Sequence, residues 1–205
     1  MICIVDYGMG NLGSIANMLR KVGADALVSS DAAVIEKAEK LILPGVGAFD
    51  NGVKNLAERD LVSLLNTQVL QRKKPILGLC LGMQLFTKSS EEGRMPGLGW
   101  IDAQTARFRF DGANSGLKVP HMGWNTLEVC QPHSLLASVD PNARFYFVHS
   151  YYVLCGDNRN ILAKTHYGVD FASVISQDNI MGAQFHPEKS HKFGMALLKN
   201  FAERV

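Results

Sequence analysis

The residue of this chain most suited to chemistry is a cysteine that stands between two glycines. Gly78, Cys80 and Gly82 lie in the run KKPILGLCLGMQLF, where an apolar stretch precedes the cysteine and good helix formers follow it. The pattern predicts a buried strand over 75–79, a sharp turn at Cys80 and a helix over 83–88. Small neighbours permit a turn steep enough to lift the sulfur out of a sheet, and the unpaired amides of a helix start favour the thiolate. The sequence therefore predicts a nucleophile at Cys80, with a buried structural cysteine as the alternative.

A cysteine that attacks an amide or an ester needs a base to take up the thiol proton and return it to the leaving group. His186 lies where an apolar strand ends in GAQFHPEKS, and Glu188 follows two residues later. Side chains two residues apart leave an extended backbone on the same face, so the carboxylate can orient the imidazole and stabilise the imidazolium. Two alternatives stay open: Glu188 caps the last helix near Ser190, or His121 in VPHMGWN is the base.

The remaining histidines and cysteines are predicted to be structural. Those histidines show neither HxH nor HExxH spacing, so we predict no metal site and no cofactor. The cysteines form no CxxC pair and lie in or beside apolar runs, which indicates reduced core residues. These residues are His133, His149, His166, His191, Cys3, Cys130 and Cys155.

The elements that position the reactive residues alternate in the first half of the chain. Short apolar runs are separated there by segments with apolar residues at helical spacing. This alternation predicts an α/β fold, a mostly parallel sheet with helices on both faces. The strands are expected over 2–7, 26–29, 40–43 and 75–79, and the helices over 12–22, 32–39 and 50–69, with Asp50 as the cap of the last.

The second half of the chain is predicted to be mainly antiparallel and to pack on the same sheet. It follows a glycine-rich connection, EEGRMPGLGW, and contains strand-like runs with little helix between them. An amphipathic helix closes the chain. The strands are expected over 103–110, 127–130, 144–154 and 171–176, and the helix over 190–205.

Length and composition favour a single domain over residues 1–205. With 205 residues and 47% hydrophobic content, the chain can bury a substantial core. A net charge of +2 without a basic patch gives no support for nucleic-acid binding. The amino terminus has no basic flank and no apolar run reaches membrane-spanning length, so we expect a cytoplasmic protein that binds no membrane.

A second hypothesis comes from the glycines near the amino terminus. Gly8, Gly10 and Gly13 form GxGxxG between a strand and a helix, and Asp31 follows the run 26–29. A dinucleotide-binding module places such glycines around a pyrophosphate and an acidic residue on a ribose. Since a tight strand-to-helix turn uses the same glycines, both interpretations stay open at this point.

Six segments together resemble one known family, and the similarity extends from Asp6 to Phe201. GLCLGMQ and HPE are typical of all class I, or triad, glutamine amidotransferases. YGMGNL, PGVGAF and HMGWN are particular to the glutaminase subunits, HisH type, of imidazole glycerol phosphate synthase, from histidine biosynthesis. The resemblance implies a three-layer, flavodoxin-like fold, in which residues 8–13 form a loop rather than a nucleotide cradle. The six segments are DYGMGNLGS, PGVGAF, GLCLGMQLF, PHMGWN, YFVHSYY and GAQFHPEKS.

The resemblance implies a glutaminase. A cysteine would attack the side-chain amide of glutamine, release ammonia and leave a glutamyl thioester that water hydrolyses to glutamate. The alternative for the whole chain is a class I glutaminase of another pathway, of the anthranilate or pyridoxal phosphate type. For the predicted glutamine contacts, the alternatives are that Gln84 is an exposed helix residue and that Ser150 and Tyr151 form an ordinary strand edge. The implied residues are Cys80, His186 and Glu188 for catalysis, Leu81, Val46 and Gly47 for the oxyanion hole, and Gln84, Ser150 and Tyr151 for glutamine.

The resemblance also implies a partner. The family delivers ammonia through a tunnel to a barrel-shaped synthase subunit of the HisF type, with which it forms a heterodimer. The pair converts a phosphoribulosyl-formimino aminoimidazole carboxamide ribonucleotide and glutamine into imidazole glycerol phosphate, the purine precursor AICAR and glutamate. Trp124, as an aromatic anchor, and Lys189, as a charge next to Glu188, are the interface contacts that we predict.

The PGVG segment is predicted to be a loop that regulates the reaction. Val46 stands between two glycines, where an amide aimed at an oxyanion requires a backbone conformation that a β-branched residue resists. We therefore expect the isolated chain to rest with its oxyanion hole unformed. Docking of the synthase subunit, with its ligand bound, would shift the loop to the competent state.

Overall fold

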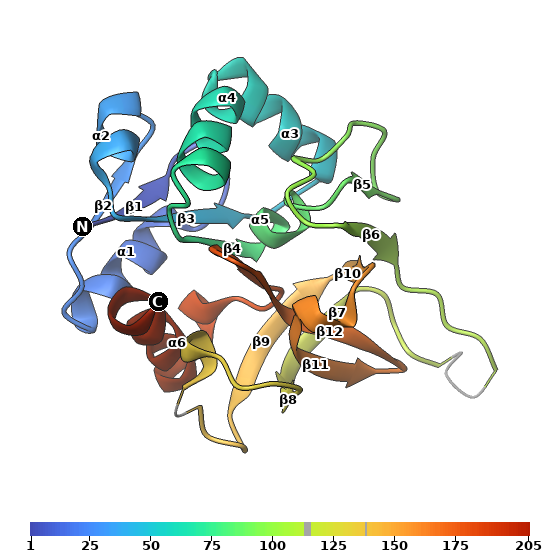
Figure 1. The fold of residues 1–205 in the computed structure, drawn as a ribbon. Helices are drawn as coiled ribbons and strands as arrows, with labels where there is room; N and C mark the ends of the chain where they lie inside the picture. The colour runs from blue at the N-terminus through green and yellow to red at the C-terminus, as the bar shows by residue number, and fades with distance from the viewer. Residues whose placement is uncertain (113–115, 138) are drawn as a thin grey trace.

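The fold is built on one mixed sheet, whose strands come from both halves of the chain (Figure 1). The computed structural model describes residues 1–112, 116–137 and 139–205. The strands of this sheet are β1 (Ile2–Val5), β2 (Ala26–Ser29), β3 (Lys40–Gly45), β4 (Ile76–Cys80), β5 (Ser89–Ser90), β6 (Ala103–Arg107), β8 (Glu128–Val129), β10 (Tyr151–Cys155), β11 (Ile161–Tyr167), β12 (Val169–Gln177) and β13 (Ile180–Ala183). Their order is β2-β1-β3-β4-β13-β12-β10-β6-β5, and β11 pairs with β12 and β8.

The first half of the chain supplies the parallel part of the sheet. β1 pairs in parallel with β2 and β3, β3 with β4, and β4 with β13. β1 and β4 are buried along their whole length, as expected of parallel strands that are covered on both faces. The predicted α/β class is therefore confirmed.

Helices cover both faces of the sheet. Apolar residues of α1 and α6 belong to one buried cluster, and those of α2, α3 and α4 belong to the other. Figure 1 shows the two groups on opposite sides of the parallel strands. The α-helices are α1 (Leu12–Lys21), α2 (Ala32–Lys37), α3 (Phe49–Glu58), α4 (Leu61–Asn66), α5 (Leu81–Gln84) and α6 (His191–Arg204). A π-helix, η1 (Thr67–Gln71), follows α4, and the short 3₁₀ helices are η3 (Ser134–Leu136), η4 (Asn158–Asn160) and η5 (Pro187–Lys189).

The second half is mainly antiparallel, as predicted, because β10 pairs antiparallel with β6 and β12, and β12 pairs antiparallel with β11 and β13. The single strand predicted over 144–154 is wrong. It divides at Ser150 into β9 (Arg144–His149), which pairs with β7 (His121–Thr126) in a separate two-stranded sheet, and β10 of the main sheet.

Two local predictions need correction around β3 and β4. Pro44 and Gly45 are the last residues of β3, so the loop begins only at Val46. The helix expected over 83–88 begins earlier and is shorter, because α5 starts directly after Cys80 and ends at Gln84. The cause is the register, since Gly45 pairs with Cys80 and both strands continue to the turn.

Asp50 does not cap α3. Ala48 is the N-cap, and the Asp50 carboxylate accepts hydrogen bonds from the amides of Arg94 and Met95 instead. The first free amide of the helix, that of Phe49, donates to Glu92 Oε2 at 2.9 Å. A carboxylate from a distant loop thus takes the place that a local cap was expected to hold.

Two further predictions are wrong. Cys130 is exposed rather than part of the core, whereas Cys3 is buried and Cys155 is partly buried. The dinucleotide-binding hypothesis also fails, because Asp31 caps α2 by accepting from the Ala33 amide at 2.7 Å.

Two glycines of that hypothesis, Gly8 and Gly10, face the chain itself, whereas a Cβ at Gly13 would meet nothing within 4 Å. Gly8 and Gly10 have φ of +83° and +99°. A Cβ at Gly8 would lie 2.7 Å from the Arg59 guanidinium, and one at Gly10 would lie 2.9 Å from the Pro44 side chain. These glycines therefore permit close packing of a turn.

Candidate active site

Cys80 lies at the apex of a strand-to-helix turn. It is the last residue of β4, its φ is +52° and its ψ is −110°, and α5 begins at the next residue. A left-handed φ at a non-glycine residue is a strained conformation of the kind that concentrates at functional sites. A Cβ at Gly82 would overlap the carbonyl oxygen of Leu43, and one at Gly78 would lie 2.7 Å from the Met83 amide. The glycines on both sides are therefore required for the turn.

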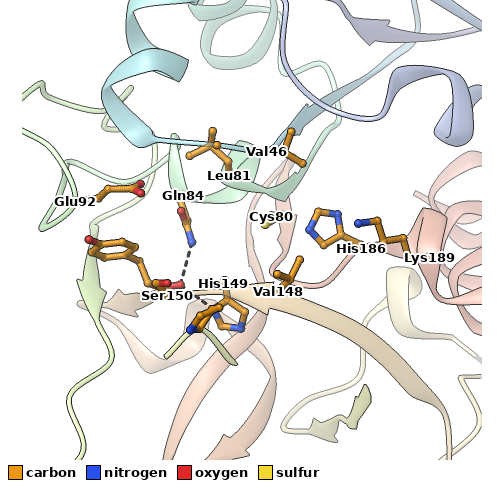
Figure 2. Close-up of a pocket in the computed structure, with 13 residues that line it drawn as sticks. Val46, Cys80, Leu81, Gln84, Glu92, Val148, His149, Ser150, His186 and Lys189 are labelled. Atoms are coloured by element: carbon orange, nitrogen blue, oxygen red, sulfur yellow. Dashed lines mark hydrogen bonds between the residues drawn. The ribbon is translucent and has the colours of Figure 1, made fainter. Parts of the chain in front are cut away.

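A cavity of about 590 Å³ opens beside this turn. Figure 2 shows Gln84 and Glu92 on one side of Cys80, and His186 and Lys189 on the other. The cavity is lined by Val46, Gly47, Cys80, Leu81, Gln84, Glu92, Pro120, Val148, His149, Ser150, Tyr151, His186 and Lys189.

The structure places His186 beside Cys80 and Glu188 behind His186. His186 Nδ1 donates to Glu188 Oε1 at 2.9 Å, and both side chains are buried. Burial opposes a positive charge on His186, but hydrogen bonds with Cys80 and with Glu188 raise its pKa to about 10. Because Nδ1 faces the carboxylate, Nε2 is the nitrogen that faces Cys80. Glu188 does not cap α6, so that alternative is wrong.

His121, the competing base, lies elsewhere. It is buried, its Nδ1 is 3.1 Å from His149 Nε2, and it does not line the cavity. Burial lowers the pKa of His121 to about 4 and that of His149 to about 3, so both rings are neutral near pH 7. His149 was expected to be an ordinary residue, but it reaches the cavity and its Nδ1 donates to the carbonyl of Tyr151 at 2.8 Å.

The three predicted glutamine contacts all line the cavity. Gln84 is 5% exposed, so the alternative of an exposed helix glutamine is wrong. Its Nε2 donates to the Tyr151 carbonyl at 3.0 Å and to Gln184 Oε1 at 3.1 Å. Ser150 lies at the break between β9 and β10, which turns the strand edge at Ser150 and Tyr151 toward the cavity.

The predicted oxyanion donors lie at the same turn. Pairing of Gly45 with Cys80 brings the loop that contains Val46 and Gly47 next to Leu81, and all three residues line the cavity. Gly47 has a φ of +100°, whereas Val46 does not have a left-handed φ.

Sequence reasoning missed two residues of this cavity region. Gln184 is fully buried and its Nε2 lies 3.7 Å from Cys80 Sγ. It stands two residues before His186, so the same alternation that paired His186 with Glu188 could have found it. Glu92 lines the cavity, and burial raises the pKa of its carboxyl group. It lies in an irregular loop with no local signal.

The two predicted interface residues, Trp124 and Lys189, both contact Tyr146. Trp124 is 46% exposed and stacks on the His191 ring, with centroids 5.5 Å apart. Lys189 lines the cavity, and its Nζ lies 5.4 Å from the centre of the Tyr146 ring, which Trp124 also contacts. An exposed aromatic residue and a lysine are thus neighbours of the same tyrosine.

Within residues 1–112, 116–137 and 139–205, no group of three His, Cys, Asp or Glu side chains is arranged to hold a metal ion. No helix in these ranges is long and apolar enough to cross a membrane.

Comparison with known proteins agrees with the geometry. The glutamine amidotransferase class-I family matches residues 3–205. The chain is 55% identical over 205 residues to imidazole glycerol phosphate synthase subunit HisH 2 of Methanococcus maripaludis, covering 100% of both chains. It is 51% identical to the subunit HisH 2 of Pseudomonas aeruginosa, again over 100% of both. A solved glutamine amidotransferase has the same fold, with a TM-score of 0.72 and 20% identity over 97% of this chain and 99% of that one.

These relatives favour the HisH subunits over class I glutaminases of the anthranilate or pyridoxal phosphate type. The chain belongs to the class I glutamine amidotransferases and, within them, to the HisH subunits of imidazole glycerol phosphate synthase.

Proposed function

We propose that this chain hydrolyses the side-chain amide of glutamine through Cys80, His186 and Glu188. The observation that carries the proposal is the strained turn at Cys80, which faces a buried, hydrogen-bonded pair of His186 and Glu188 across one cavity. A nucleophile, a base and a group that orients the base are the parts that acyl transfer requires.

The reaction begins with attack of the Cys80 thiolate on the amide carbon of glutamine. The His186 imidazolium gives its proton to the leaving nitrogen, so that ammonia departs and a glutamyl thioester remains on Cys80. His186 then takes a proton from water, which attacks the thioester and releases glutamate and the thiolate. Glu188 stabilises the imidazolium through its bond to Nδ1, which supports the protonated state from which the first step starts.

The developing oxyanion is stabilised by backbone amides. The Leu81 amide, at the start of α5, is one donor, and an amide of the loop at Val46 and Gly47 is the other. Loss of a donor of this kind costs on the order of a hundredfold in rate. Val46 has no left-handed φ in this structure of the chain alone, which supports the proposal that the loop reaches its competent state only in the complex.

Glutamine is held by groups on the opposite side of Cys80. The Glu92 carboxylate is the anion in the cavity that suits the α-ammonium group, and its bond from the Phe49 amide fixes its position. Gln84 and the backbone at Ser150 and Tyr151 supply the neutral hydrogen-bonding groups. A glutamine carbon skeleton that bridges Glu92 and Cys80 places its amide carbon beside the sulfur.

The ammonia passes to a barrel-shaped synthase subunit of the HisF type in a cytoplasmic heterodimer, which makes imidazole glycerol phosphate and AICAR. Membership of the HisH subunits supports this pairing. Trp124 and Lys189, which both contact Tyr146, are the proposed contacts with the partner.

The test measures glutamate release by the chain alone and with a HisF-type subunit and its nucleotide substrate. We expect release that requires Cys80 and rises strongly with partner and nucleotide. Cys130→Ala is the matched control, because that cysteine is exposed and does not line the cavity. Activity that survives Cys80→Ala, or a complex without glutaminase activity, contradicts the proposal.

A further inference from the structure

Cys80 has a second polar neighbour besides His186. Gln184 directly follows β13 and is fully buried, and its Nε2 lies 3.7 Å from Cys80 Sγ. The Gln184 backbone amide donates to the Ser173 carbonyl at 2.9 Å, which ties this residue to β12. The amide group is therefore held against the sulfur by its strand as well as by its side-chain contacts.

Hydrogen bonding fixes which end of the Gln184 amide faces the sulfur. The Tyr151 carbonyl can only accept, so its partner at 3.0 Å on Gln84 is the nitrogen. That same Gln84 nitrogen lies 3.1 Å from Gln184, and the Gln184 atom there is therefore the oxygen. The nitrogen of Gln184 is left to point at Cys80 Sγ, as a donor.

The Tyr151 carbonyl, which fixes the orientation of the Gln84 amide, has a second donor. The Tyr151 carbonyl also accepts from His149 Nδ1 at 2.8 Å. His149 is neutral, because burial lowers its pKa to about 3, and its Nε2 then accepts from His121 Nδ1. Each donor between His121 and Gln184 thus meets an acceptor, since His149 and Gln84 both donate to the Tyr151 carbonyl and Gln84 also donates to Gln184 Oε1.

We propose that Gln184 is a catalytic residue of this site, whose carboxamide N–H donates to Cys80 Sγ and stabilises the thiolate. The inference rests on the proposed role of Cys80 as the nucleophile. A carboxamide suits this task because it donates without ionising, and so it does not compete with His186 for the proton. A thiolate accepts a stronger hydrogen bond than a thiol does, and the burial of Gln184 excludes water that could replace the donor.

Two substitutions separate this role from packing. Gln184→Met keeps the length of the side chain and removes the donor. Gln184→Glu keeps an oxygen that accepts from Gln84 but turns a second oxygen toward the sulfur, where it repels the thiolate. Gln68→Met is the matched control, since Gln68 is a fully buried glutamine of η1 whose side chain has no hydrogen-bond partner among the described residues.

The readout is the rate at which iodoacetamide alkylates Cys80 in the full chain, followed by mass spectrometry between about pH 5 and 9. A hydrogen bond to a charged group is worth about a tenfold change or more, so we expect Cys80 to react about tenfold more slowly at the acid end in Gln184→Met. Gln184→Glu reacts more slowly still. All rates converge at high pH, where the thiolate forms without help, and Gln68→Met follows the wild type throughout.

The outcomes distinguish this inference from the proposed function. If Cys80 of the wild type reacts no faster than the exposed Cys130, the nucleophile assignment itself is wrong. If Cys80 reacts quickly and both Gln184 variants keep the wild-type profile, only the role of Gln184 is wrong. A uniform decrease at every pH also overturns it, because lost packing lowers the rate without moving the acid limb. Circular dichroism selects folded variants, and Gln184→Glu decides the matter if Gln184→Met does not fold.

Discussion

Replacing Glu188 by glutamine tests how the site controls the charge of His186. The substitution preserves shape and leaves an oxygen that can accept from His186 Nδ1, now 2.9 Å from Glu188 Oε1. The other carboxylate oxygen, Oε2, is buried and has no hydrogen-bond partner among the described residues. The change therefore removes the negative charge without removing another hydrogen bond, and the fold is expected to survive.

The magnitude follows from the lost charge. The imidazolium charge is spread over the ring, so the centres of the two charges lie farther apart than the hydrogen-bonded atoms, and unit charges about 4 Å apart attract each other by about 4 kcal/mol at an effective dielectric constant of about 20. The retained hydrogen bond is worth about 1 kcal/mol, which leaves a loss of about 3 kcal/mol in the stability of the imidazolium. Because the proposed first step needs that imidazolium to protonate ammonia, kcat is expected to fall by roughly a hundredfold.

The assay is glutamate release in the complex with the synthase subunit and its nucleotide substrate. The matched control is Glu58→Gln, which removes a carboxylate from an exposed pair with Lys54 at 3.6 Å and is expected to leave kcat unchanged. A kcat of Glu188→Gln within about twofold of the wild type refutes the proposed role of the carboxylate.

A second readout is the pH dependence of stability. Burial opposes the charge of His186, yet its bonds to Cys80 and Glu188 raise its pKa from the usual 6.5 to about 10. A raised pKa contributes stability that is complete below about pH 6.5 and is lost as the pH rises through about 10. The difference in unfolding free energy between wild type and Glu188→Gln should therefore narrow over that interval, and a difference that widens contradicts the reasoning.

Three other outcomes are expected. Cys80→Ala abolishes glutaminase activity and keeps the circular dichroism spectrum, since the side chain lies at the cavity surface; retained turnover would be evidence against the nucleophile. A glutamine-like electrophile labels Cys80 quickly, whereas Cys3 and Cys155 stay unreactive because burial raises the pKa of each thiol to about 11. Mass spectrometry follows each cysteine separately, including the exposed Cys130, and equal labelling of all of them would contradict this prediction. Val46→Gly raises the basal rate of glutamate release by the isolated chain about tenfold, because it relieves about 1–3 kcal/mol of backbone strain in the competent loop. An unchanged basal rate would contradict the proposed strain at Val46.

Local sequence patterns were sufficient to predict the sharp turn at Cys80 and the pairing of His186 with Glu188. The turn at Cys80 depends on glycines within two residues of it, and the pairing of His186 with Glu188 depends on a separation of two residues. The parallel strands could also be predicted from the sequence. β2 has the predicted bounds, and β1, β3 and β4 each differ from their predicted bounds by only one or two residues at an end. Short apolar runs between breakers carry that information.

Contacts between distant segments could not be predicted in this way. The Phe49 amide and Glu92 are 43 residues apart, and nothing near either residue indicates the bond. The burial of Gln84 depends on Tyr151 and Gln184, which come from the second half of the chain. The division of the strand at Ser150 has the same origin, since β9 and β10 find different partners.

One strand pair joins the two local motifs. β13 lies beside β4 in parallel, with Ala183 opposite Leu79, so the residues that follow β13 emerge next to Cys80. Phe185 is fully buried on the opposite face, with its ring 4.2 Å from that of Phe145. Because side chains alternate along an extended backbone, this buried ring keeps both Gln184 and His186 on the side of the sulfur, and a slip of one residue would remove both at once. The aromatic core thus sets the register on which the proposed chemistry of Cys80 depends.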